Sequence, residues 1–164
     1  MKKIGIILAA AVLSFGLSFP ASAAGPDAPG TKLITVQAGG FPGFGGLASG
    51  QIVLTNIAGG HLYGGFLLGA NFRHGAILDS KKMEFSLAPR VMLGWNLGRV
   101  VEFHAGGLAG IAMQHFDELK SNLAFCYGGF GGFRLNFSDS FGIVLEGCYS
   151  NCLPYATGGF AFRF

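Results

Sequence analysis

The end of the chain carries the pattern that most restricts its fold. Residues 157–164 read Thr-Gly-Gly-Phe-Ala-Phe-Arg-Phe, which places Phe160, Phe162 and Phe164 at every second position, with Arg163 between two of them. In an extended strand the three rings point to one side and Arg163 points to the other. A soluble strand at a chain end has no obvious cover for three rings, whereas a strand between lipid and a polar interior suits both faces. The pattern therefore predicts a membrane-facing β-strand.

The beginning of the chain has the features of an export signal. Two lysines precede an apolar stretch over residues 4–19, and Ala21-Ser22-Ala23 is the small-x-small pattern that signal peptidase cleaves. We expect a signal peptide over 1–23 and a single mature domain over 24–164. No cysteine stands at the cleavage point, so a lipoprotein is not expected. An uncleaved anchor helix is the alternative, but Pro20 ends the apolar run too early for one.

Composition narrows the class of fold further. A mean hydropathy of +0.50 with 29 glycines and only 12% charged residues is unusual for a soluble domain. Beyond residue 23, no apolar run approaches the roughly 18 residues that a membrane helix requires. A closed barrel is then the membrane-compatible solution, because lipid cannot satisfy the backbone groups of an open sheet edge. Outside the signal peptide, nine basic residues stand against eight acidic ones, which gives no electrostatic argument for nucleic acid as a partner.

Period-two alternation divides the mature chain into eight expected strands. It is clearest around Phe85, Leu87 and Val91, which share one face, while Glu84 and Arg90 share the other. Two of the expected strands are less regular. The second is ambiguous in phase. The fourth contains Pro89, which predicts a bulge because proline cannot donate a ladder hydrogen bond. The expected strands are residues 32–41, 48–57, 61–74, 84–96, 99–113, 124–135, 141–149 and 155–164.

The connections between these strands alternate in length. Short turns are expected at residues 58–60, 96–98 and 136–140, and longer loops at 41–48, 75–83, 114–123 and 150–154. Short periplasmic turns that alternate with longer outer loops are typical of outer-membrane barrels, and an even strand number returns both termini to one side. The fold class that follows is all-β: an eight-stranded antiparallel up-and-down transmembrane β-barrel after a cleaved signal peptide.

An eight-stranded barrel has room inside for side chains but not for an open channel. Charged residues at inward positions must then be paired or hydrated. We expect a network of ion pairs and water in the lumen, with Arg90 within one register step of Glu102 or His104. The alternative is a gated polar path for a small ion or solute. The expected lumen residues are Arg73, Glu84, Arg90, Glu102, His104, Arg134, Glu146 and Arg163.

Aromatic residues gather where the expected strands end. Rings at both ends of a barrel are typical anchors at the two membrane interfaces. The periplasmic group comprises Trp95, Phe137, Phe141 and Phe164, and the outer group comprises Phe41, Phe125, Tyr149 and Tyr155.

The last residues also resemble a known signal. Thr157, Gly159, Phe162 and Phe164 match the C-terminal assembly signal of bacterial outer-membrane β-barrels: a polar residue, a glycine two positions later, and alternating aromatics that end the chain. With the signal peptide and eight strands, the mature chain resembles the small outer-membrane proteins of the OmpX and OmpA-transmembrane-domain type. The resemblance implies a monomer in the bacterial outer membrane, insertion by the barrel-assembly machinery, and outer-membrane lipid and lipopolysaccharide as partners.

Three cysteines remain in the mature chain. In an oxidising compartment two of them can pair, and the sequence leaves all three pairings open. Cys148 and Cys152 bracket an expected loop tip, which favours a local clip, with Cys126 as a small lumen or interface residue. No partner shows the spacing of metal ligands, so we expect no metal and no cofactor.

Some barrels of this size are enzymes that modify lipid A. The deacylase type uses a His-x-Ser pair, and none of the four histidines here has a serine two residues on. The palmitoyltransferase type uses outer histidine, aspartate and serine, and the loop from His115 to Ser121 contains all three. No base and no oxyanion site are evident for Ser121, so we expect no catalysis.

Adhesion through the outer loops is the other class of function that the sequence leaves open. The expected loops are short, and Lys81, Lys82 and Lys120 offer only a weak basic surface toward lipopolysaccharide phosphates. The sequence therefore favours a structural or surface role with a filled lumen. The alternatives, in order, are binding or adhesion by the surface loops and lipid A modification.

Overall fold

The computed structural model describes residues 28–41, 43–74, 81–116 and 119–164, with the backbone alone at 73, 74, 81, 82, 116, 119 and 120. The expected signal peptide over 1–23 lies outside the described residues.

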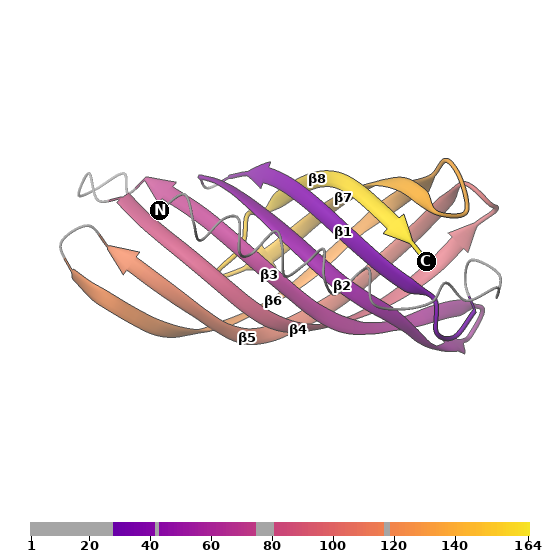
Figure 1. Cartoon of the computed structure of the whole chain (residues 1–164), viewed down its shortest axis with the longest axis horizontal. Helices are drawn as coiled ribbons and strands as arrows, with labels where there is room; N and C mark the ends of the chain where they lie inside the picture. Colours follow the sequence, from indigo (N-terminus) through magenta and orange to yellow (C-terminus); the bar gives the residue numbers. More distant parts are fainter. Residues whose placement is uncertain (1–27, 42, 75–80, 117–118) are drawn as a thin grey trace.

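Eight antiparallel strands form a closed barrel, which confirms the predicted sheet topology (Figure 1). Each strand pairs with its neighbours in the chain, and β1 pairs with β8 to close the ring. Two further hydrogen bonds extend this closure, because the N–H groups of Lys32 and Phe164 each donate to the other's carbonyl at 2.9 Å. The strands are β1 (Lys32–Gly40), β2 (Phe44–Ile57), β3 (Gly60–His74), β4 (Lys81–Leu97), β5 (Val101–Phe116), β6 (Leu119–Asn136), β7 (Phe141–Ser150) and β8 (Ala156–Arg163).

The two ends of the barrel differ. We call the end with the first residue of β1, the last of β8 and the turns β2–β3, β4–β5 and β6–β7 the terminal end, and the opposite end the loop end. The strands β3 to β6 have 15 to 18 residues, whereas β1, β7 and β8 have 8 to 10. The rim at the loop end is therefore uneven, and β3 to β6 form its tall side (Figure 1).

The first connection at the loop end is shorter than predicted. A longer loop was expected over 41–48, but β2 begins at Phe44, and the Phe41 N–H donates to the Gly43 carbonyl at 2.8 Å in a tight turn. Phe41 has φ of 61°, in the left-handed region. The prediction failed because Gly45 and Gly46 extend the strand without contributing to the alternation that reveals one.

Side chains alternate between the lumen and the outer wall as the sequence predicts. In β4, Glu84 and Arg90 are buried and point inward, whereas Leu87 and Val91 are exposed. The phase of β2, which the sequence left open, puts Leu47, Ser49, Gln51 and Val53 inward. A register shift between Val53 and Thr55 explains the ambiguity, because a bulge interrupts the period of two.

The bulge expected at Pro89 is absent. Pro89 faces Phe66 in the regular register of β3 and β4. On the β5 side the pairs Leu87–Ile111 and Arg90–Leu108 are three residues apart on both strands, so no residue is inserted. Pro89 is exposed on the outer wall, and the pairing of β4 with β5 is interrupted at Ala88 and Pro89.

The distribution of polarity is the reverse of that in a soluble protein. Phe66, Val91 and Phe160 on the outer wall are 61%, 53% and 52% exposed, whereas Glu102 and Arg134 inside are 0% and 2% exposed. Soluble monomers seldom expose such large contiguous apolar surfaces. Among the residues that the structure describes, no helix has the length and apolarity needed to cross a membrane.

Candidate functional site in the barrel lumen

The first group of inward charges lies toward the terminal end and is centred on Glu102. We call Glu102, Arg134, Arg163 and Tyr63 the Glu102 cluster. Arg134 Nη2 forms an ion pair with Glu102 Oε2, to which Tyr63 donates at 3.3 Å and Arg163 at 3.4 Å. Glu102 and Arg134 lie directly opposite each other across β5 and β6, so strand register alone brings them together. Gly94 makes room, since a methyl group there would stand 2.8 Å from Glu102 Oε1.

The second group crosses the lumen nearer its middle. We call Arg90, His104, Glu146 and Phe130 the Glu146 cluster. Glu146 Oε1 accepts from Arg90 Nη2 at 2.5 Å and from His104 Nε2 at 3.0 Å. The Arg90 guanidinium carbon also lies 3.7 Å from the centre of the Phe130 ring, a cation–π contact. Side chains from β4, β5, β6 and β7 therefore meet in this cluster, and those of Arg90 and His104 share one oxygen of the Glu146 carboxylate.

The predicted partner of Arg90 was wrong. Arg90 was expected within one register step of Glu102 or His104, but it pairs in register with Leu108, and His104 pairs with Gly94. Its ionic partner is Glu146 on β7, which is not a neighbouring strand. Sequence alternation identifies which residues point inward, but contacts across the lumen depend on the curvature of the closed wall.

The remaining predicted lumen residues lie toward the loop end. Glu84 is 1% exposed and its Oε1 accepts from Gln114 Nε2 at 2.7 Å. The side chain of Arg73 lies outside the described residues. The structure thus brings six of the eight predicted residues into the two clusters and places Glu84 apart from them.

The interior is less ionic than the sequence suggested. A ladder of uncharged polar groups links β8, β1 and β2: Thr157 donates to Gln37 at 2.7 Å, and Thr35 and Ser49 hydroxyls are 2.8 Å apart. Apolar side chains fill much of the remaining space, and they include Leu33, Val53, Leu67, Met92, Leu108 and Val144. These apolar residues point inward and so depart from the expected pattern of apolar residues outside and polar residues inside. The sequence did not reveal them, because the charged residues near them do follow that pattern.

The cysteine pairing also differs from the expected clip. Cys126 on β6 is bonded to Cys152 in the β7–β8 connection, and Cys148 is free and buried. Cys126 and Cys152 continue the register in which Gly128 faces Ser150, and their Cα atoms are 5.6 Å apart. This Cα separation lies within the range that a disulfide bridges. The exact register of the β6–β7 hairpin is the signal that would have identified this pair.

The four residues of the expected assembly signal lie on β8 and at its end. Thr157 is buried, and Phe162 and Phe164 are 38% and 45% exposed on the outer wall. Gly159 faces inward against β1, where a side chain would meet the Val36 carbonyl. The inward face of β8 therefore has a polar residue and a glycine, and its outward face has aromatic residues.

Aromatic rings gather at both ends of the barrel. At the terminal end, Phe141 packs against Phe137, Phe160 and Phe162, with ring centres 5.6 to 6.2 Å apart. At the loop end, Tyr155 packs against Phe41 at 5.9 Å and Tyr149 at 6.3 Å. Tyr149 is 85% exposed.

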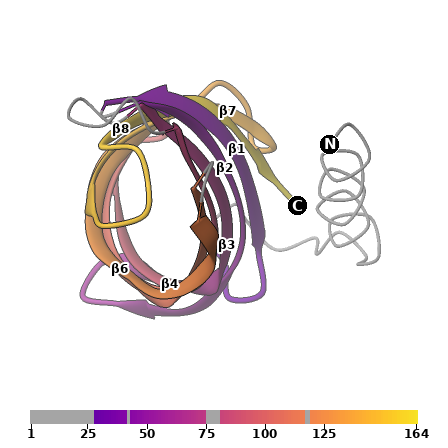
Figure 2. The ribbon, with the colours of Figure 1, turned by 90° about the vertical axis from the view of Figure 1, so that its left-hand side faces the viewer.

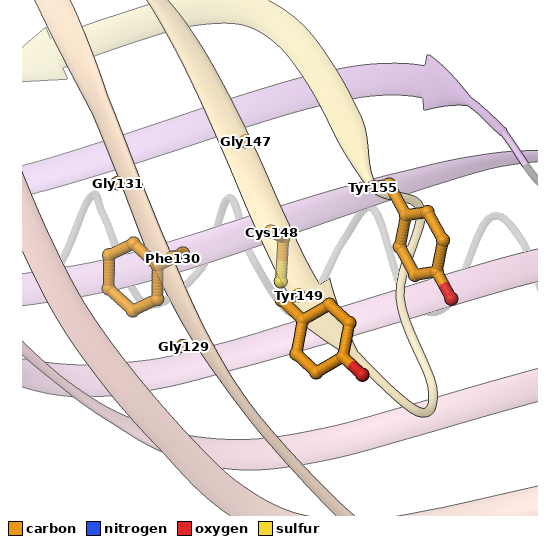
Figure 3. Close-up of a pocket in the computed structure, with 7 residues that line it drawn as sticks. All are labelled: Gly129, Phe130, Gly131, Gly147, Cys148, Tyr149 and Tyr155. Carbon is orange, nitrogen blue, oxygen red and sulfur yellow. The ribbon is translucent and has the colours of Figure 1, made fainter.

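A shallow groove of about 500 Å³ lies beside these tyrosines on the outer wall (Figure 3). Outward-facing glycines floor it, because Gly129 and Gly131 on β6 and Gly147 on β7 leave the wall without side chains. Tyr149 and Tyr155 border it, and their hydroxyl groups point the same way (Figure 3). The groove is therefore mostly apolar, and the two tyrosine hydroxyls are side-chain polar groups at its border.

The histidine and serine considered for catalysis come together. His115 Nδ1 lies 3.1 Å from Ser121 Oγ, so the expectation that no base reaches Ser121 was wrong. Both residues are exposed and lie at the register shift between β5 and β6. The contact alone does not make a nucleophile, which also needs an orienting group and an oxyanion site. Among the described residues, no group of three or more histidine, cysteine or acidic side chains is arranged to hold a metal.

Comparisons with known proteins give weak similarities. No family model and no curated protein matches the chain. A structure of the Yersinia pestis outer membrane protein Ail in a phospholipid bilayer nanodisc aligns at 15% identity and a TM-score of 0.49, and covers 84% of this chain and 100% of that one. A crystal structure of Ail, the attachment invasion locus protein of Yersinia pestis, aligns over the same shares at 16% identity and a TM-score of 0.44. These values are too low to carry a function across, so the barrel itself must support any proposal.

Proposed function

We propose that the protein is an integral β-barrel of the bacterial outer membrane with a structural or surface role. The inverted polarity of the closed barrel carries this proposal. Apolar rings cover the outer wall, ion pairs lie inside, and the β1–β8 ladder leaves no open sheet edge. Lipid satisfies no backbone hydrogen bonds, so a sheet in a membrane must close in this way.

The lumen supports a structural role better than transport. The Glu102 and Glu146 clusters cross it at two levels, and buried apolar side chains also fill the interior. A barrel of eight strands has an interior that side chains can fill. We therefore propose that the lumen is plugged.

Lipid is the proposed main partner. The aromatic groups at both ends suit the two membrane interfaces, and the groove beside Tyr149 and Tyr155 suits an acyl chain with its polar end at the phenolic hydroxyls. Lipopolysaccharide would surround the loop end. Thr157, Gly159, Phe162 and Phe164 would serve the barrel-assembly machinery, and the closed sheet is consistent with a monomer.

Cell fractionation and gel migration test this function together. We expect the full-length chain, expressed in a Gram-negative host, in the outer-membrane fraction. We also expect the unboiled protein to migrate faster in detergent gels than the boiled protein, because the closed ladder resists detergent until it is heated. Recovery from the soluble periplasm, or identical migration before and after boiling, would count against the proposal.

Surface binding is a second candidate, and the uneven rim favours it. The strands β4, β5 and β6, with 17, 16 and 18 residues, rise beyond their shorter neighbours at the loop end. Such a wall would present side chains outside the membrane to a partner. Cells that display the intact protein should then bind an extracellular-matrix preparation better than cells with a shortened β5–β6 hairpin. Equal binding would remove this candidate.

A further inference from the structure

The connection between β7 and β8 turns into the barrel instead of away from it. Cys152 and Leu153 are each 1% exposed, and Pro154 is also buried. Figure 2 views the barrel from its loop end and shows this yellow connection within the outline of the strands. Connections at a barrel rim are normally solvated, so burial of three successive residues indicates a specific packing role.

The buried residues reach the far side of the lumen. A methyl group at Gly69 on β3 would stand 2.5 Å from Leu153 Cδ2, and one at Gly45 on β2 would stand 2.8 Å from Pro154 Cγ. In the ring of strands, β8 and β1 lie between β7 and β2. Leu153 and Pro154 therefore span the mouth, and the glycines opposite leave the space that they occupy.

Several bonds hold this segment in place, and one of them is covalent. The disulfide joins Cys152 to Cys126 on β6. Beside the disulfide, the Asn151 side chain forms hydrogen bonds with the backbone of β6, as a neighbouring strand would. It accepts from the Tyr127 N–H at 2.9 Å and donates to the Phe125 carbonyl at 2.8 Å. The Ser150 hydroxyl accepts from the N–H groups of Cys152 and Leu153 at 3.1 and 3.3 Å.

Polar groups that find no partner among the described side chains lie next to this segment. Asn71 is 0% exposed, and within the described part of the chain neither atom of its amide has a partner; the buried Ser86 hydroxyl has none there either. Ser86 Oγ would stand 2.5 Å from a methyl group at Gly69, so it lies beside Leu153. Asn71 faces Gly45, the residue that Pro154 covers. Buried polar groups of this kind are usually satisfied by enclosed water.

We propose that Asn71 and Ser86 belong to a hydrated chamber in the outer half of the lumen, and that residues 151–155 are a disulfide-latched stopper over it. A thiol reductant opens the stopper to small polar solutes. Two reductant thiols supply two electrons and two protons and become a disulfide. The Cys126–Cys152 bond breaks, and each cysteine sulfur takes one proton. The chamber then exchanges with the medium, while the two charged clusters still block the rest of the lumen.

A cysteine placed behind the stopper reports whether the stopper is closed or open. The reporter barrel carries Ser86→Cys and Cys148→Ser, so its single free thiol lies beside Leu153. The unlatched barrel carries Cys126→Ser and Cys152→Ser in addition. The measurement is the rate of alkylation of residue 86 by iodoacetamide, read by peptide mass spectrometry. We expect alkylation in the unlatched barrel to be about 100-fold faster, the factor that corresponds to the typical contribution of one disulfide to stability.

A matched control separates opening from general loosening. Ser140→Cys in the exposed β6–β7 turn, with Cys148→Ser, should react at the same rate in latched and unlatched barrels. If the unlatched variant does not assemble, reduction of the folded reporter barrel by dithiothreitol, removed before labelling, gives the same comparison. Equal rates at residue 86 in latched and opened barrels would overturn the proposal, and so would fast alkylation while the disulfide is intact.

Discussion

Arg90 on β4 and Glu146 on β7 meet across the lumen, Nη2 to Oε1 at 2.5 Å, although β5 and β6 lie between their strands in the wall. Both side chains are almost fully buried. The pair therefore braces opposite parts of the barrel, and His104 donates to the same carboxylate oxygen. The desolvation cost of a buried ion pair offsets much of its Coulombic attraction, but removal of one partner leaves a buried charge without a counterion and is strongly destabilising.

Glu146→Gln should destabilise the barrel by about 3 to 5 kcal/mol, because Arg90 is left as a buried charge without its counterion. The measurement is the free energy of unfolding in urea from lipid vesicles. Glu102→Gln should have a comparable effect through Arg134. The exposed Asp139→Asn is the control and should change little.

Replacement of both partners of the ion pair distinguishes a loss of stability caused by an uncompensated charge from one caused by lost packing. Arg90→Met with Glu146→Leu should recover most of the stability that Glu146→Gln loses, since no uncompensated charge remains. A double variant that is as unstable as the sum of its single variants would contradict this account of the pair.

Planar bilayers should show no steady ion current through the wild-type barrel. Arg90→Ala should also remain closed, because the Glu102 cluster still crosses the lumen nearer the terminal end. Single-channel recording at both polarities is the measurement. A reproducible unitary current in the wild type would show that the lumen is a path and would remove the plug.

The side chain of Phe164 should matter for assembly in cells more than for the fold itself. Its backbone makes the two hydrogen bonds to Lys32 that extend the β1–β8 closure, and Phe164→Ala keeps both of them. We expect less folded protein in the outer membrane but nearly unchanged refolding into detergent. Leu97→Ala, an exposed residue at the same end, is the control. Equal losses from both variants would mean that Phe164 has no special role in recognition.

His115→Ala and Ser121→Ala should leave the lipid A of the host unchanged. The two side chains touch, but they are exposed, and the contact alone supplies no oxyanion site. Mass spectrometry of lipid A from cells with wild-type and variant protein is the measurement. A lipid A species that appears with the wild type and disappears in both variants would establish an enzyme.

Local patterns predicted the wall of the barrel well and the contacts within it poorly. The alternation around Glu84 and Arg90 follows from strand geometry, which acts over a few residues. The partner of Arg90 and the pairing of Cys126 with Cys152 depend on hairpin register and on curvature around the whole ring, and no local pattern encodes these. Glycine has no side chain to show which face of a strand it belongs to, so the sequence did not reveal that β2 begins at Phe44. Nothing in the sequence around Leu153 indicated that its loop turns inward.

The fluorescence of Trp95, the single tryptophan of the chain, tests the central claim most directly. Trp95 is 42% exposed on the outer wall near the terminal end. In vesicles of phospholipids with bromine near the headgroup end of the acyl chains, we predict strong quenching of its emission and little quenching by acrylamide in the water. In a Trp95→Phe background, Phe66→Trp on the outer wall should be quenched by bromine, and Leu67→Trp in the lumen should not. Emission from Trp95 that acrylamide quenches freely and brominated lipid leaves unchanged would show that the apolar wall does not face a membrane.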